Sequence, residues 1–187
     1  MRLLLATRNA HKLREFERLL PGVALDPLPQ EARTPEETGE TYAENALIKA
    51  RSAAAATGRP AFADDSGVEA EALGGRPGVR TARYAGEHAT DEENLAKLHA
   101  EAPAGSRLRY VCAIAHVTPE GAEHVFEGTC TGTLAATPHG AGGFGYDPLF
   151  IPDEAPGSTM AELTDAQKDA ISHRGHAARA LLEWLRR

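Results

Sequence analysis

Two pairs of neighbouring carboxylates are the residues of this sequence best suited to bind a divalent metal ion. Glu36 and Glu37 lie in a segment flanked by proline and glycine, and Asp64 and Asp65 follow the apolar stretch 61–63. Proteins hold Mg²⁺ with one or two carboxylates together with substrate phosphate oxygens and water. Because successive side chains of an extended segment point to opposite sides, we expect Asp64 and Asp65 to have different roles. One of them could bind metal or activate water, and which one does so is open.

Each acidic pair also has a purely structural interpretation. Glu36 and Glu37 could belong to a solvated acidic loop. The segment Asp64-Asp65-Ser66-Gly67 could form an Asx-type turn at the end of a short strand. This second interpretation is the weaker one, because it places two charges against the edge of the core.

The N-terminal segment Thr7-Arg8-Asn9-Ala10-His11-Lys12 joins an apolar strand to a helix. A helix N-terminus offers free backbone N–H groups and a partial positive charge, which suit a phosphate group. Thr7 and Asn9 add neutral donors, and Lys12 adds a mobile ammonium. Alternatively, Asn9 only caps the helix while Lys12 points into solvent. The segment is not a P-loop, because it lacks both glycine-rich nucleotide-binding patterns.

Basic residues near the C-terminus form a third group. Lys168 precedes Ser172-His173-Arg174, where the last helix is expected to begin. Positive charge in the first turn is unfavourable for the helix dipole, so an anionic or carbonyl-rich ligand would explain it, and a salt bridge to a carboxylate is the alternative. Phe144 and Tyr146 lie in a glycine-rich loop and could be core aromatics or could stack on a nucleotide base.

The composition is that of a globular protein. The chain has 187 residues, 42% of them hydrophobic, and 20 basic against 27 acidic side chains give a net charge of −7. This acidic balance argues against binding of duplex nucleic acid, which needs clustered basic residues. Cys112 and Cys130 are not spaced as metal ligands, and no apolar run is long enough to span a membrane. We therefore expect a cytoplasmic protein with reduced cysteines and no membrane or nucleic-acid partner.

Alternating helices and strands are expected to position these side chains. The apolar patterns and turn residues predict strands over 3–6, 23–25, 61–63, 108–117 and 123–134. They predict helices over 13–20, 41–56, 90–99, 164–170 and 172–186. This order indicates an α/β or α+β fold around a mixed sheet, with residues 1–187 forming a single domain.

Eight segments in order resemble the inosine triphosphate pyrophosphatase family, the non-canonical purine nucleoside triphosphate pyrophosphatases. Each segment alone is weak, but together they extend over most of the chain. They are residues 7–12, Glu36-Glu37-Thr38-Gly39, Glu44-Asn45-Ala46 with Lys49-Ala50, 63–67, 73–78, 81–84, Gly142-Gly143-Phe144-Gly145-Tyr146-Asp147-Pro148 and Ser172-His173-Arg174. One departure is Arg8, which stands where many relatives carry glycine, so a positive φ there is in doubt and a contact with phosphate is an alternative.

The resemblance implies Mg²⁺-dependent hydrolysis of ITP, dITP or XTP to the monophosphate and pyrophosphate. It implies an elongated mixed sheet flanked by helices, two lobes with the active-site cleft between them, and a homodimer. Asp65 would be the catalytic base and a metal ligand, and Glu37 or its neighbour Glu36 would share the metal. The implied substrate-binding residues are Thr7, Arg8, Asn9, Ala10, His11, Lys12, Ser66, Phe144, Gly145, Tyr146, Asp147, Lys168, His173 and Arg174.

Two other functions remain alternatives at this point. A Maf-like nucleotide pyrophosphatase acting on pyrimidine or modified nucleotides would use the same acidic residues. A module that binds purine nucleotides without cleaving them would not need so many carboxylates near a polyphosphate. The pair of segments around Phe144 and His173 favours a purine substrate, because donors such as Lys168, His173 and Arg174 match a 6-oxo group.

Overall fold

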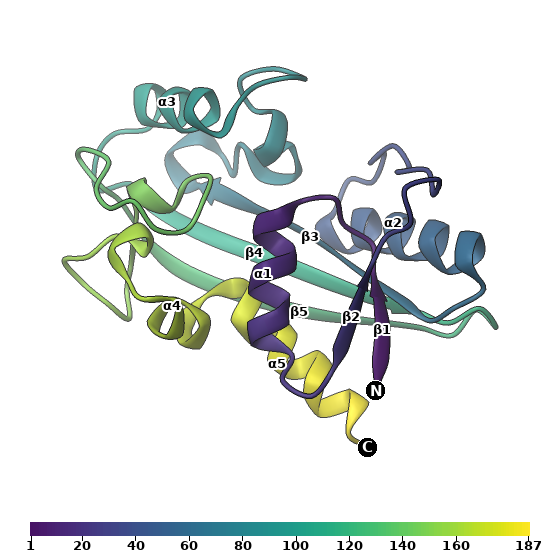
Figure 1. Cartoon of the computed structure of the whole chain (residues 1–187). Helices are drawn as coiled ribbons and strands as arrows, with labels where there is room; N and C mark the ends of the chain where they lie inside the picture. The colour runs from purple at the N-terminus through teal and green to yellow at the C-terminus, as the bar shows by residue number, and fades with distance from the viewer. The chain divides into compact units, whose positions relative to one another are not determined.

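A six-stranded mixed sheet forms the centre of the fold. The computed structural model describes residues 1–187, and its strands follow the order β2-β1-β3-β4-β5-β6 (Figure 1). The strand β1 runs parallel to both β2 and β3, whereas β6 runs antiparallel to β5. The strands are β1 Arg2–Leu5, β2 Ala24–Pro27, β3 Ala61–Ala70, β4 Arg107–Val117, β5 Glu123–Leu134 and β6 Phe150–Pro152. A mixed α/β fold was predicted, and it is confirmed.

Five α-helices flank the sheet, close to their predicted positions. They are α1 Ala10–Leu19, α2 Tyr42–Thr57, α3 Asp91–Glu101, α4 Asp165–Ile171 and α5 His173–Leu185. The capping boxes predicted at Thr41 and Thr90 are both formed, so the side chains of Glu44 and Glu93 bond back to the cap residues. Four short 3₁₀ helices and the strand β6 were not predicted. No helix has both the length and the apolar character needed to cross a bilayer.

The chain divides into two compact units, each built from separate segments. Unit 1 comprises Met1–Asp65, Cys112–Gly128 and Arg174–Arg187, and unit 2 comprises Ser66–Val111 and Thr129–His173. Neither unit is one continuous stretch of chain, and a single domain over residues 1–187 stays a prediction.

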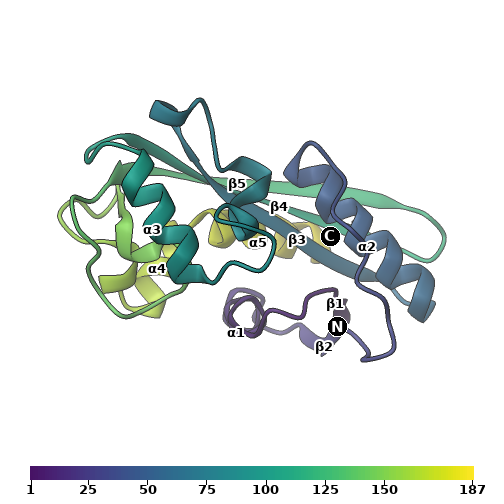
Figure 2. The same ribbon diagram turned by 90° about the horizontal axis from the view of Figure 1, so that it is seen from above.

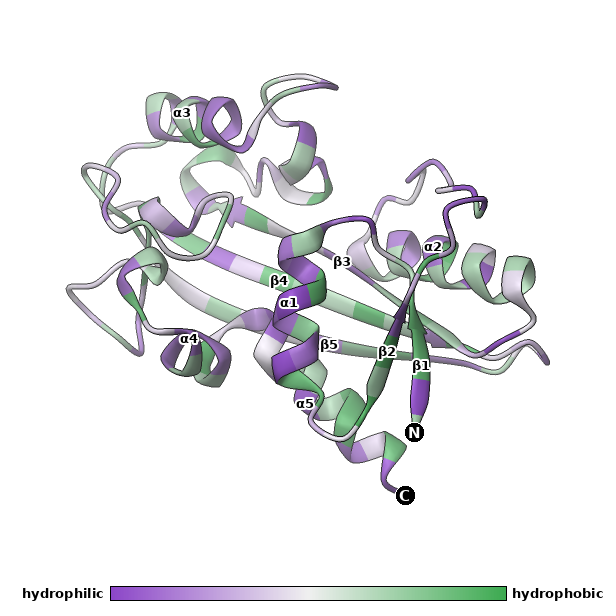
Figure 3. Cartoon of the chain, viewed as in Figure 1, coloured by the Kyte–Doolittle hydropathy of each residue, from purple (hydrophilic) through white to green (hydrophobic).

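Unit 1 has a core between the sheet and the helices α1 and α5. Phe16 of α1 meets Phe62 of β3 edge to face, with ring centroids 5.3 Å apart. Leu3 and Leu5 of β1 and Leu181 of α5 belong to the same cluster, and the hydrophobic colour follows β1 in Figure 3. The helix α2 lies across β3 from α1 (Figure 2). The two faces of β3 therefore contact different helices in unit 1.

Unit 2 has its own core. It combines Leu98 of α3, Tyr110 of β4, Leu134 of β5 and Phe150 of β6. The rings of Tyr110 and Phe150 are stacked, with centroids 4.2 Å apart. Gly132 of β5 faces Ile151 so closely that a Cβ atom there would lie 2.3 Å from a carbonyl oxygen. The absence of a side chain at this position lets β6 pair closely with β5.

Candidate active site

The two neighbouring aspartates lie inside a strand and not at its end. The predicted strand stops at residue 63 with a turn at Ser66-Gly67, whereas β3 continues to Ala70 and Ser66 is a half-buried strand residue. The strand is therefore longer than predicted, and the Asx-type turn considered for residues 64–67 is not formed. The strand tolerates two buried carboxylates because cations from distant parts of unit 1 reach each of them. The prediction that Asp64 and Asp65 point to opposite sides is confirmed by their different partners.

Asp64 faces α1 and α5, where two cations contact it. Its Oδ2 atom lies 2.9 Å from Lys12 Nζ and 3.3 Å from Arg174 Nη2. Arg174 also donates from Nη1 to Glu15 Oε2 at 2.5 Å. Burial raises the pKa of Asp64, but the positive charges of Lys12, Arg174 and Lys49 outweigh burial and hold the pKa well below its ordinary value. Asp64 is thus ionised at neutral pH.

Asp65 faces α2 and has a different environment. Asn45 donates from Nδ2 to Asp65 Oδ2 at 3.3 Å, and Lys49 donates from Nζ to Oδ1 at 3.3 Å. Burial raises the pKa of Asp65, and the charges of Lys49 and Lys12 offset this only in part, so the pKa lies above its ordinary value. A carboxylate with a raised pKa is suited to accept a proton. Of the two aspartates, only Asp65 has a raised pKa, and its role as the catalytic base stays a prediction.

The acidic loop before α2 brings one of its two glutamates to the side of β3 on which Asp65 lies. Glu37 is half-buried, and its Oε1 atom accepts a hydrogen bond from Lys49 Nζ at 2.7 Å. Glu36 is exposed. The loop is held at Gly39, whose N–H donates to Asn45 Oδ1 at 2.8 Å. A Cβ atom at Gly39 would lie only 2.6 Å from Glu44 Cβ, so this approach requires glycine.

The arrangement of Glu37 and Asp65 suits a Mg²⁺ ion. Both carboxylates contact the same ammonium group, that of Lys49, so their oxygens converge on one region that already attracts positive charge. No group of three or more His, Cys, Asp and Glu side chains with metal-binding geometry is present. Two carboxylates suffice when the remaining ligands are water and substrate phosphate oxygens. Of the two predicted glutamates, Glu37 is the better placed ligand.

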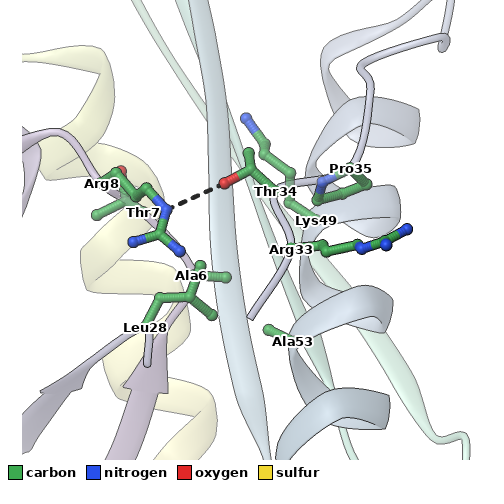
Figure 4. A pocket seen from close by; sticks show the side chains of 9 residues that line it. All are labelled: Ala6, Thr7, Arg8, Leu28, Arg33, Thr34, Pro35, Lys49 and Ala53. Atoms are coloured by element: carbon green, nitrogen blue, oxygen red, sulfur yellow. Dashed lines mark hydrogen bonds between the residues drawn. The ribbon is translucent and has the colours of Figure 1, made fainter. Parts of the chain in front are cut away.

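In the predicted phosphate-binding segment, the helix cap considered for Asn9 is formed, but the solvent-directed position considered for Lys12 is not. Asn9 caps α1, and its side chain accepts hydrogen bonds from the N–H groups of His11 at 2.9 Å and Lys12 at 3.1 Å. Lys12, however, points to Asp64 and not into solvent. A pocket opens beside this segment (Figure 4), lined by Ala6, Thr7, Arg8, Leu28, Arg33, Thr34, Pro35, Lys49 and Ala53. Lys12 thus lies beside Asp64, and Lys49 lies beside Glu37 and Asp65.

A second polar cluster lies in unit 2 around Asp147. Its Oδ2 atom accepts from Lys168 Nζ at 2.7 Å and from the Phe144 N–H at 3.0 Å, and Tyr110 donates to Oδ1 at 3.1 Å. The Lys168 ammonium lies 5.1 Å from the centre of the Phe144 ring. Tyr146 packs in the core and donates to the Thr81 carbonyl at 2.8 Å. Of the two aromatics in the glycine-rich loop, Phe144 therefore keeps the more accessible ring.

The two basic residues that open α5 are both buried. His173 stacks on Tyr110 in unit 2, with ring centroids 4.5 Å apart. In unit 1 the Arg174 guanidinium contacts Asp64 and Glu15, which is the salt-bridge alternative. Contact of either side chain with a nucleotide base stays a prediction.

Sequence reasoning assigned no role to Lys49, Asn45 or Glu15. Asn45 and Lys49 are one helical turn apart on α2, so their spacing places them on the same side of that helix. This i, i+4 pair was a usable signal. Nothing near Glu15 in the sequence indicates its partner, because Arg174 lies 159 residues away.

Comparisons with known proteins identify relatives over nearly the whole chain. Residues 3–184 match the sequence model of the Ham1 family. A Cutibacterium acnes protein named dITP/XTP pyrophosphatase is 49% identical, over 97% of this chain and 94% of its own length. A Nocardia farcinica protein of the same name is 51% identical, over 97% of this chain and 93% of its own. The solved structure of a HAM1 protein from Coxiella burnetii is 40% identical, with a TM-score of 0.88, and covers 99% of this chain and 98% of that one.

Proposed function

The chain belongs to the Ham1 family, and from this premise we propose that it hydrolyses non-canonical purine nucleoside triphosphates such as ITP, dITP and XTP to the monophosphate and pyrophosphate. The observation that carries the proposal is the meeting of Glu37, Lys49 and Asp65 in a chain whose relatives are named dITP/XTP pyrophosphatases. Neither the Maf-like alternative nor the binding-only alternative is favoured.

Glu37 and Asp65 would hold Mg²⁺ together with phosphate oxygens of the substrate. When bound, the ion would offset the negative charge that develops on the leaving pyrophosphate. Lys12 has three N–H donors, and one contact with Asp64 leaves others for phosphate oxygens. The positive end of the α1 dipole favours the same anion.

Asp65 would accept the proton of the water molecule that attacks the α-phosphorus. In the protein without metal, burial holds the pKa of Asp65 above its ordinary value, and a carboxylate with a higher pKa is a stronger proton acceptor. Asn45 and Lys49 hold the two carboxylate oxygens in place. Asp64 is unsuited to this role, because two cations engage its Oδ2 atom and lower its pKa.

Hydrogen-bond donors that match a 6-oxo group would select the purine base of the substrate. Hypoxanthine and xanthine carry an acceptor at this position, whereas adenine carries an amino donor. Lys168, with His173 and Arg174 as further predicted donors, would find no acceptor at this position of adenine, and such a mismatch can cost several orders of magnitude in specificity. Phe144 supplies a ring on which a base could stack.

One panel of substrates tests the proposal. We expect kcat/KM for ITP and XTP with Mg²⁺ to exceed that for ATP by about 100-fold or more, with pyrophosphate and not orthophosphate as the product. Asp65→Asn should lose turnover by about 10²- to 10⁴-fold while still binding ITP. Equal rates for ATP and ITP would exclude the 6-oxo explanation, and near-normal turnover of Asp65→Asn would exclude Asp65 as the base.

The homodimer and the cytoplasmic location stay predictions. Light scattering coupled to size-exclusion chromatography measures the first directly, with a monomer mass of 19.9 kDa as the reference. A mass of about twice this value is expected.

A further inference from the structure

Arg8 makes an unusual set of contacts for a residue of a phosphate-binding segment. Its Nη2 atom lies 2.7 Å from the Ala32 carbonyl oxygen, 3.2 Å from that of Gln30 and 3.3 Å from that of Pro29. Its Nε atom donates to Thr34 Oγ1 at 3.2 Å, the bond drawn in Figure 4. All four acceptors belong to the loop 28–41, which joins β2 to α2.

The sequence raised two possibilities for Arg8, a backbone with positive φ or a contact with phosphate. No residue other than glycine has a positive φ, so Arg8 fits its position without a strained backbone. A guanidinium has five N–H donors in a fixed plane. Those on Nε and Nη2, three of the five, face protein acceptors in the loop 28–41.

The loop that Arg8 contacts carries a proposed metal ligand. Thr34 is followed by Pro35, which restricts the backbone, and then by Glu36 and Glu37. Pro35, Arg8 and Lys49 line the same pocket, and Glu37 contacts Lys49 at 2.7 Å. Glu37 follows Thr34, the last contact of Arg8, by only three positions.

We propose that Arg8 is a positioning residue, which fastens the loop 28–41 to the phosphate-binding segment and thereby places Glu37 beside Lys49 and Asp65. The inference rests on the proposed function, because it concerns the metal ligands of that reaction. Ordering a long irregular loop has an entropic cost, and the contacts of Arg8 offset it before any substrate arrives. The same residue links the backbone that would hold phosphate to the carboxylate that would hold metal.

Residue-resolved hydrogen exchange on the protein without metal or substrate tests the inference independently of activity. Two amides report on the loop: Ala32 N–H bonds to the Pro29 carbonyl at 3.1 Å, and Gly39 N–H bonds to Asn45 Oδ1. In Arg8→Met both should exchange about tenfold faster than in the wild type, because the loop opens more often. Arg33→Met removes the same charge from the same pocket and should leave both rates unchanged. Arg8→Lys should restore part of the protection.

Kinetics separate positioning from direct contact with substrate. For Arg8→Met we expect the Mg²⁺ concentration at half-maximal ITP hydrolysis to rise by about threefold or more, while KM for ITP at saturating Mg²⁺ changes less than about twofold. If the two amides of Arg8→Met exchanged at the wild-type rate while its KM for ITP rose, the inference would be overturned and Arg8 would be a substrate contact. Unchanged exchange with unchanged kinetics would also overturn it. If the wild type fails to hydrolyse ITP, the proposed function fails, while the exchange rates still decide the role of Arg8.

Discussion

Asp64→Asn is expected to lower the free energy of unfolding by about 3–5 kcal/mol. The Asp64 and Arg174 side chains are only 1% and 3% exposed, and Asp64 lies 2.9 Å from Lys12 and 3.3 Å from Arg174. At an effective dielectric constant of about 20, each attraction is on the order of 5 kcal/mol before the cost of burial is subtracted. Amide substitution removes both attractions and leaves a buried guanidinium without the Asp64 carboxylate. The loss is large beside a typical total stability of about 5–15 kcal/mol.

Urea denaturation at neutral pH measures this loss. With an m-value of about 2 kcal/mol/M, the midpoint of Asp64→Asn should fall by about 1.5–2.5 M. Glu123→Gln is the matched control, because Glu123 also pairs with an arginine, Arg51, at 2.6 Å but is 31% exposed. An exposed pair contributes at most about 1 kcal/mol. If Asp64→Asn lost no more stability than this control, the reasoning about the buried charges would be refuted.

The stabilisation by Asp64 should also depend on pH, in a direction that follows from its pKa shift. The pKa of Asp64 is lower in the folded protein than its ordinary value of 3.8. The unfolded state therefore binds the proton more readily, so the contribution of Asp64 is present above pH 3.8 and is lost as the pH falls below it. The difference in stability between wild type and Asp64→Asn should shrink in that acidic range. A difference that instead grew on acidification would contradict the assigned direction of the shift.

Three further predictions concern the proposed metal site, the loop before α2 and the recognition of the purine base. Lys49→Met leaves Glu37 and Asp65 without the cation that they share. Mg²⁺ should therefore raise the melting temperature of this variant more than that of the wild type. An equal rise in both proteins would contradict the convergence of the two carboxylates. Gly39→Ala should cost about 1–3 kcal/mol in urea denaturation, because its Cβ would meet Glu44 Cβ at 2.6 Å, and an unchanged midpoint would show that the loop can move away. Lys168→Met should reduce the ratio of kcat/KM for ITP over ATP by about tenfold or more, whereas a preserved ratio would remove Lys168 from base selection.

Local sequence signals were sufficient for most of the fold. The capping boxes at Thr41 and Thr90 fixed where α2 and α3 begin, since these bonds involve residues only three apart. The strand β6 was missed because its three residues are too few to show a pattern. The error at β3 has another cause. Asp64 and Asp65 resembled the end of a strand, and the cations that permit them inside it come from Lys12, Lys49 and Arg174, far away in the sequence.

The same limit applies to the active site. The alternation of side chains along a strand predicted that Asp64 and Asp65 would differ, but it could not assign the roles, because each role depends on partners brought by the fold. Lys12 and Arg174 hold Asp64 ionised, which makes it an anchor for two cations. On the other side, burial outweighs the charges of Lys49 and Lys12 and holds the pKa of Asp65 above its ordinary value. One strand thus places two neighbouring carboxylates in opposite electrostatic environments, and the catalytic role of Asp65 stays a prediction that Asp65→Asn tests.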